Sequence, residues 1–227
     1  MKKEIFQKVL VDNLNKNFQS RSKYFDFNFF VFGELSATVF EINKCLILEF
    51  NKASITLTNN LIERLLKLSL IYYEAEVGHK QFEDLNIVYE LLSKKYSSIP
   101  FGNSIEKCRK LDLITENEKV ILFDTIRVLM RNGFSHADST KILKNIPEET
   151  IMFKGCFSNL QEIKPVTINQ NILPSIQALH TQNFANENAA DYFDYVFDLI
   201  KKLDKRLTDR IKNSELDMGK INDCIIP

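Results

Sequence analysis

The stretch from Thr115 to His136, which reads TENEKVILFDTIRVLMRNGFSH, predicts a long helix that ends in a polar hexapeptide. Thr115 and Glu118 have the T-x-x-E spacing of a capping box, so we expect the helix to begin there. Apolar residues then recur at helical spacing and predict a buried face, made of Leu122, Phe123, Ile126, Leu129 and Met130. The same period returns in segments on both sides of this stretch, which predicts an all-α fold.

The hexapeptide from Arg131 to His136 brings a cation, an amide, a hydroxyl and an imidazole together. Residues five apart in an α-helix point about 140° away from each other, so Arg131 and His136 would serve different surfaces of an unbroken helix. Gly133 suits the left-handed residue that ends many helices, so we expect the helix to stop there and the chain to turn. Asp138 is then expected to cap a short helix through Leu143, which places His136 beside backbone N–H groups that favour phosphate.

Helical spacing predicts further core helices over 35–50, 58–75, 82–96 and 187–212, and a shorter one near 104–111. Residues 1–19 are expected to form an amphipathic helix, and Gly78 to end the helical region that begins at 58. The Phe-rich segment 24–32 alternates like a strand. An extended segment packed on helices fits the same pattern, because no partner strand is evident nearby.

Residues 146–186 show no clear helical period until about 173 and carry several Pro, Asn and Gln. We therefore expect a long irregular connection, of the kind that is functional or mobile, with Ile151 to Phe153 extended. The whole chain, 1–227, is interpreted as one helical domain. Within it, 1–32 is an N-terminal extension, 146–186 a loop or insertion, and 187–212 the last long helix, followed by a frayed tail.

Composition limits the classes of function. The chain has 227 residues, 44% of them hydrophobic, with 18 Phe and no Trp, so a large Phe-rich core is expected. Lys+Arg and Asp+Glu both number 30, and a neutral chain predicts only local contact with nucleic acid. The four Cys lie far apart, which argues against a zinc site or a disulfide scaffold. No signal-like or membrane-spanning run is present, so we expect a soluble cytoplasmic protein.

The motif RNGFSH resembles the signature of the HEPN superfamily (higher eukaryote and prokaryote nucleotide-binding), in which Arg and a polar residue, often Asn, precede His by a few residues. The resemblance covers about 33–138 and the last long helix, and it implies a HEPN-like helical bundle. Many members are metal-independent RNA endonucleases of toxin–antitoxin, abortive-infection or CRISPR-linked defence. A toxin subgroup carries Tyr two residues after the His, where a partner nucleotidyltransferase modifies it. This chain has Asp138 there, so regulation by that route is not expected.

The resemblance implies a metal-independent RNA endonuclease, a toxin or anti-phage effector, with Arg131 and His136 catalytic and Asn132 and Ser135 supporting. RNA carries its own nucleophile, the 2′-OH, so cleavage needs proton transfer and positive charge on the phosphate. An imidazole with an ordinary pKa of about 6.5 can transfer protons near neutral pH. A guanidinium can hold two phosphate oxygens, and neither a metal nor a cofactor is expected.

One chain offers one His at this motif, whereas acid and base roles ask for two groups. The resemblance implies that two protomers of a homodimer pool their motifs in one cleft, with an antitoxin or defence-system protein as a further partner. The alternative is a catalytically silent HEPN domain that binds RNA, nucleotide or a protein through the same cleft. A helical adaptor with a coincidental motif is a third interpretation. His79 and His180 are expected to be surface or packing residues.

Overall fold

The computed structural model describes residues 2–76, 82–135, 147–156 and 159–223. Its elements are mainly helical, which confirms the all-α prediction. In chain order they are α1 (Lys3–Arg21), η1 (Ser22–Tyr24), η2 (Gly33–Leu35), α2 (Ser36–Ile47), α3 (Asn51–Ala75), α4 (Phe82–Ser97), α5 (Phe101–Lys110), α6 (Glu116–Val120), η3 (Ile121–Ser135), β1 (Glu149–Cys156), β2 (Asn159–Asn169) and α8 (Pro174–Asp223).

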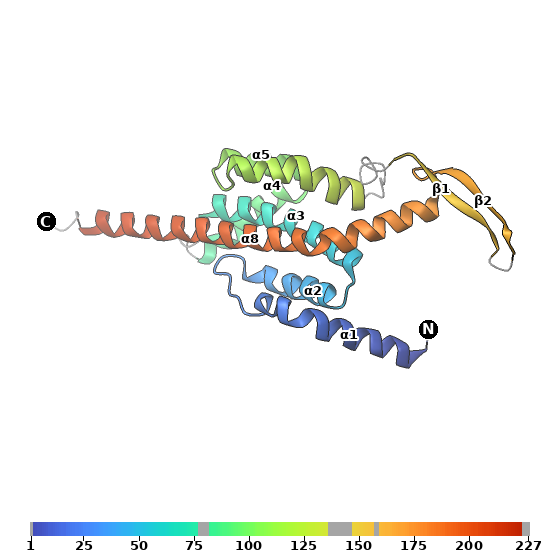
Figure 1. Cartoon of the computed structure of the whole chain (residues 1–227). Helices are drawn as coiled ribbons and strands as arrows, with labels where there is room; N and C mark the ends of the chain where they lie inside the picture. Colours follow the sequence, from blue (N-terminus) through green and yellow to red (C-terminus); the bar gives the residue numbers. More distant parts are fainter. Residues whose placement is uncertain (1, 77–81, 136–146, 157–158, 224–227) are drawn as a thin grey trace.

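The helices α3 and α8 lie side by side at the centre of the molecule, and the other helices cover them from two sides (Figure 1). α2 and α1 lie on one side; α4 and α5 lie on the other. The core between these layers is aliphatic and aromatic, and Phe32, Phe101 and Phe193 are among its largest fully buried side chains. Most of the buried hydrophobic residues are nevertheless Leu and Ile, and several Phe side chains are exposed, so the expected Phe-rich core forms only in part.

The Phe-rich segment forms no strand in residues 24–32; it lies against the helices instead. The carboxylate of Asp204 on α8 accepts backbone hydrogen bonds from the N–H groups of Phe30, Val31 and Phe32, at 3.0, 2.7 and 3.1 Å. One side chain thus accepts the bonds that a neighbouring strand would have accepted. The phenyl ring of Phe27 packs edge-on against Phe197 of the same helix, with ring centroids 5.2 Å apart.

The predicted start of α3 shifts, whereas its predicted end at Ala75 is confirmed. α3 begins at Asn51, earlier than the expected 58, because Ser54 and Thr58 are buried and extend the helix with polar residues that an apolar pattern overlooks. It ends at Ala75, and the cap residue Glu76 has φ 49° in the left-handed region. Gly78, which we expected to end this region, lies outside the described residues.

The last helix is much longer than predicted. α8 spans 50 residues from Pro174 to Asp223, whereas the periodic segment covers only 187–212, and the expected frayed tail is helical as far as Asp223. Proline is well suited to the first helical position, because its ring fixes φ and no N–H is needed there. The turn before it is fixed by Asn169, whose side chain accepts from the N–H of Asn171 at 2.9 Å.

The connection before α8 is not irregular throughout: it holds an antiparallel hairpin of β1 and β2. Ile151 to Phe153 are extended, as predicted, and pair with residues 165–167. The expectation of an irregular connection failed because the partner strand contains Pro165 and polar residues, and no periodic pattern marks it as β.

α1 is a helix as predicted, but its apolar residues are not buried. Ile5, Val9, Leu14 and Phe18 are all exposed, and only Arg21 of this helix is buried. Polar groups join the second half of α1 to the end of α2: Asn13 and Asn17 donate to the carbonyls of Leu48 and Ile47 at 3.1 and 3.0 Å. No helix among the described residues combines the length and apolarity needed to cross a membrane.

Candidate functional site: the end of the motif helix

The motif helix begins where the sequence predicts. Thr115 caps α6, and its hydroxyl accepts from the N–H of Glu118 at 3.2 Å. The Glu118 carboxylate in turn accepts from the N–H of Thr115 at 2.8 Å, which completes the capping box. Arg206 of α8 donates to both oxygens of Glu118, at 2.7 and 3.1 Å, so the start of the motif helix is fixed to α8.

After Val120 the helix continues in η3 with π-helical winding, in which hydrogen bonds join residues five apart. Leu122, Ile126 and Met130 are buried, and Phe134 is half-buried against the same core. This spacing of four suits a helix wound more widely than an α-helix. π-Helical turns are rare and occur often at functional sites.

The helix does not stop at Gly133, so the expected turn there is wrong: η3 runs on through Ser135. Beyond the glycine, the ring of Phe134 stacks on Phe184 of α8, with centroids 6.3 Å apart. This contact offsets the cost of about 1 kcal/mol that an interior glycine imposes on a helix. His136 and the expected helix 138–143 lie outside the described residues, as does the side chain of Ser135, so their placement stays a prediction.

Arg131 of η3 lies against α3 and α5. Its Nη2 atom is 2.9 Å from the carboxylate of Glu63 on α3, and its guanidinium carbon is 5.4 Å from the ring centroid of Phe101 at the start of α5. Lys67 also pairs with Glu63, at 3.1 Å. The Arg131 side chain keeps 30% of its surface exposed, so this cation reaches solvent while its position is fixed.

The backbone just before Arg131 is also fixed, by a buried polar pair. The amide of Asn59 donates to the carbonyl of Met130 at 2.9 Å, and the hydroxyl of Tyr192 donates to the oxygen of Asn59 at 2.7 Å. Burial raises the pKa of Tyr192, and the positive charge of Arg131 only partly opposes this, so the phenol stays neutral and donates. The end of η3 is therefore tied to α3 and α8 together.

A second arginine follows the same side of η3. The Arg127 guanidinium lies 3.6 Å above the ring centroid of Phe123, and its Nε donates to the Phe123 carbonyl at 3.3 Å. A Cβ on Gly102 of α5 would lie 3.4 Å from the Phe123 ring and 3.7 Å from Arg127, both ordinary contact distances, so this end of α5 packs directly on the pair. Lys67 and Arg131 both pair with the Glu63 carboxylate, whereas Arg127 packs on Phe123 one turn earlier in η3.

Sequence reasoning identified Arg131 and Asn132 but missed the residues that hold them. Glu63, Asn59, Phe101 and Tyr192 come from three other helices, and no spacing rule connects them to the motif. Asn59 does leave a signal, because it is a polar residue in the apolar stripe between Ile55 and Ile62, both buried. Such a residue predicts a buried hydrogen bond, although not its partner. Asn132 is half-buried.

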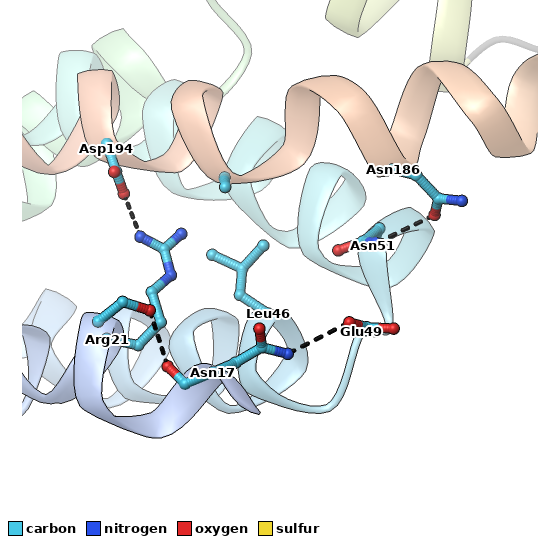
Figure 2. A pocket seen from close by; sticks show the side chains of 9 residues that line it. Asn17, Arg21, Leu46, Glu49, Asn51, Asn186 and Asp194 are labelled. Carbon is cyan, nitrogen blue, oxygen red and sulfur yellow. Dashed lines mark hydrogen bonds and ion pairs between the residues drawn. The ribbon is translucent and has the colours of Figure 1, made fainter. Parts of the chain in front are cut away.

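Away from the motif, a polar hollow of about 330 Å³ lies between α1, the end of α2, the start of α3 and α8 (Figure 2). Arg21, only 7% exposed, pairs there with Asp194 at 2.5 Å, and its guanidinium lies 4.9 Å from the ring centroid of Tyr24. Asn51 donates to Asn186 at 3.0 Å. The second terminal nitrogen of Arg21, Nη2, is buried and has no hydrogen-bond partner among the described residues. The Arg21–Asp194 and Asn51–Asn186 pairs join α1 and α3 to α8 across the hollow.

Of the other histidines, His180 is half-buried on α8, with its Nε2 3.2 Å from the amide oxygen of Gln170, as expected of a packing residue. His79 lies outside the described residues. Within the described ranges, no three His, Cys, Asp or Glu side chains group as metal ligands. Comparisons with models of known protein families, with curated proteins and with solved structures find no match to this chain.

Proposed function

We propose that the protein is a metal-independent RNA endonuclease of the HEPN type, in which Arg131 and His136 are the catalytic residues. Asn132 and Ser135 support the site by orienting the backbone or a partner group. The proposed protein is a cytoplasmic homodimer that acts as a toxin or an anti-phage effector, together with an antitoxin or another defence protein. This proposal extends the resemblance of RNGFSH to the family signature.

The observation that carries the proposal is the arrangement around Arg131. A cation that is fixed by Glu63 and Phe101, and that still reaches solvent, can bind a phosphate without first losing conformational freedom. The Asn59 bond to Met130 prevents the backbone beneath it from shifting. The second supporting observation is that η3 is π-helical through Ser135, because π-helical turns often occur at functional sites.

In the proposed reaction, the 2′-OH of the RNA attacks the adjacent phosphate. His136 of one protomer accepts the proton of the 2′-OH, and His136 of the second protomer protonates the departing 5′-oxygen. Arg131 stabilises the negative charge that grows on the phosphate oxygens. The products end in a 2′,3′-cyclic phosphate and a free 5′-OH.

The test is cleavage of labelled RNA, in the presence of EDTA, by the parent chain and by His136→Ala, Arg131→Ala and Arg131→Lys. We expect His136→Ala to lower the rate roughly 10²- to 10⁴-fold. Arg131→Ala should cost a few kcal/mol of transition-state stabilisation, and lysine should restore little of it, because a point charge does not reproduce the guanidinium fork. Arg127→Ala is the matched control, since it removes an arginine from the same helix outside the motif.

Cleavage that survives both alanine substitutions would exclude the motif as the active site. A requirement for added magnesium would refute the metal-free mechanism, and RNA methylated at the 2′-OH of the cut site should resist. Melting temperatures measured beside the rates separate a catalytic defect from unfolding. If both alanine variants unfold, the residues are structural.

The Glu63–Arg131 pair specifically favours the second candidate, a silent domain that binds RNA without cutting it. A carboxylate beside the cation partly neutralises it and would repel a reacting phosphate. Under either candidate, Glu63→Gln should tighten RNA binding about fivefold, the equivalent of about 1 kcal/mol for one partly exposed charge. Fluorescence anisotropy with a short labelled RNA measures this. Unchanged affinity would mean that Arg131 only forms a structural ion pair.

A further inference from the structure

The hairpin of β1 and β2, hereafter the arm, projects from the end of α8 beyond the helical body (Figure 1). Its large apolar side chains are exposed on both faces of the ribbon. Ile151 and Phe153 lie on one face, and Met152 and its cross-strand neighbour Val166 lie on the other. A two-stranded ribbon is marginally stable in water without support on one face or edge. The arm is therefore expected to gain stability from further strands at one of its edges.

The two edges of the arm differ in their ability to pair with another strand. β2 contains Pro165, which has no N–H to donate, so this edge is a poor template. The described part of β1 contains no proline, and its ladder continues to Glu148, whose carbonyl accepts from the N–H of Gln170 at 2.8 Å. The outer edge of β1 is therefore the better template.

Charge indicates what kind of strand fits this edge. Lys154 of β1 lies directly opposite Lys164 of β2, and like charges at such positions destabilise a ribbon. The strand has the opposite charge at its other end, at Glu148 and Glu149. An antiparallel copy of β1 would place its own acidic end beside Lys154, so the strand is complementary to itself.

We propose that β1 pairs antiparallel with β1 of a second copy of this chain, about a two-fold axis at Met152, and that the two arms form one four-stranded sheet. In this register Ile151 lies opposite Phe153 of the other copy, twice, on one face. Met152 meets Met152 on the other face. Lys154 lies diagonal to Glu148 of the second copy, within reach of a long side chain. The interface is closed and uses the same surface from both copies.

This inference does not depend on the proposed function, because it holds whether or not the motif cleaves RNA. It specifies an element of the dimer that the nuclease proposal leaves unassigned. The arm begins 13 residues after His136, so pairing of the arms and cleavage at the motif can be measured on the same variants.

The first experiment compares the mass in solution of the parent with that of the double variant Ile151→Lys/Phe153→Lys, by light scattering across a dilution series. We expect the parent at twice 26.5 kDa, and the variant's dimer dissociation constant to be weaker by about 100-fold or more. The control is Ile87→Lys/Phe30→Lys, because Ile87 is 63% exposed like Ile151, and Phe30 is 73% exposed against 72% for Phe153. The control should remain a dimer.

The second experiment tests the register directly. Residues opposite each other in an antiparallel pair have Cα atoms about 4.5–5.5 Å apart, which suits a disulfide. With Cys45, Cys156 and Cys224 replaced by Ser, Met152→Cys should form a covalent dimer under mild oxidation, whereas Ile87→Cys should not. Capture by Met152→Cys alone supports the pairing even if the lysine variants misfold.

A monomeric parent at every concentration would overturn the proposal. A dimer that Ile151→Lys/Phe153→Lys leaves intact, and that Met152→Cys does not link covalently, would also overturn it. A dimer lost through Phe6→Lys in α1, but retained by the arm variants, would assign the interface to α1 and also refute the inference. RNA cleavage is recorded separately: a parent that forms the arm dimer but cuts no RNA supports this inference while the nuclease proposal fails.

Discussion

At the scale of single residues, the carboxylate of Asp204 fixes a whole segment of the chain to α8. It accepts from three consecutive N–H groups, those of Phe30, Val31 and Phe32, and so holds an extended segment against α8 without a sheet. Bonds to an ionised acceptor are stronger than those to a neutral one. The side chain therefore determines where the Phe-rich segment packs.

We expect Asp204→Asn to lower the free energy of unfolding by about 2–3 kcal/mol, because the amide has one acceptor oxygen and brings an NH₂ group against the backbone donors. Asp209→Asn, on an exposed position of the same helix, is the control and should change little. Urea unfolding followed by circular dichroism measures both. Equal stability of the two variants would mean that water replaces the three hydrogen bonds to Asp204 without loss of stability.

Glu118 is the second residue that we expect to contribute strongly to stability. Burial alone would raise its pKa, but hydrogen bonds from Arg206 and from the Thr115 N–H outweigh burial and lower it. A carboxylate with a lowered pKa in the folded state stabilises the protein above its unfolded pKa of about 4.3. This stabilisation is lost as the pH falls through the folded pKa.

Glu118→Gln should therefore lower stability at pH 7 by about 1–3 kcal/mol and remove part of the loss of stability on acidification. Glu116→Gln is the control: Glu116 lies on the same turn and pairs with Arg109 at 2.9 Å, but its side chain is 59% exposed. Surface pairs contribute about 0–1 kcal/mol. The measurement is the melting temperature between pH 3 and 7; parallel curves for Glu118→Gln and the parent would contradict the assigned role.

At the scale of elements, local patterns predicted which segments are helical, and long-range contacts decided where the helices end. The Thr115–Glu118 capping box is a local signal, and the helix does begin there. Gly133 is also a local signal, but the contact of Phe134 with Phe184, 50 residues away, overrides it. The length of α8 and the partner strand of β1 were missed because polar residues that lie on an exposed surface leave no periodic pattern.

The same limit applies to the candidate site. The sequence marked Arg131 through its motif. It could not mark Glu63, Asn59 or Tyr192, because their relation to the motif exists only once α3, α8 and η3 pack together. A motif can be recognised from the sequence alone, whereas the groups that hold its residues come from the three-dimensional packing.

The pair of Asn59 and Tyr192 makes a prediction about how η3 is coupled to α8. Tyr192→Phe removes the hydroxyl that donates to Asn59 and should cost about 1–2 kcal/mol of stability. If the proposed function holds, this variant should also lower RNA cleavage, because Asn59 fixes the carbonyl next to Arg131. Tyr195→Phe on the same helix is the control, since the Tyr195 hydroxyl has no hydrogen-bond partner among the described residues. Hydrogen exchange at the end of η3 should be faster in Tyr192→Phe alone.

At the scale of the whole molecule, the helices of the body share one core centred on α3 and α8. Cys108 of α5 lies inside this core with no exposed surface, and its thiol lies 3.7 Å from the carbonyl of Leu66 on α3. Burial raises the pKa of the Cys108 thiol to about 12. Since the thiolate is the reactive form, the folded protein should protect Cys108 both by exclusion of reagent and by protonation.

This protection predicts how the core opens. With Cys156 and Cys224 replaced by Ser, an alkylating reagent at pH 8 should modify Cys45, which is half-buried on α2, well before Cys108. If α2, α3, α5 and α8 unfold as one unit, Cys108 should react only through global unfolding, and its rate should follow the denaturant midpoint of the whole protein. Asp204→Asn should then accelerate labelling of Cys108 by about 30- to 150-fold, the factor equivalent to 2–3 kcal/mol. Mass spectrometry of the labelled peptides measures both rates. If Asp204→Asn leaves the rate of Cys108 labelling unchanged, α5 opens separately from the core around α8.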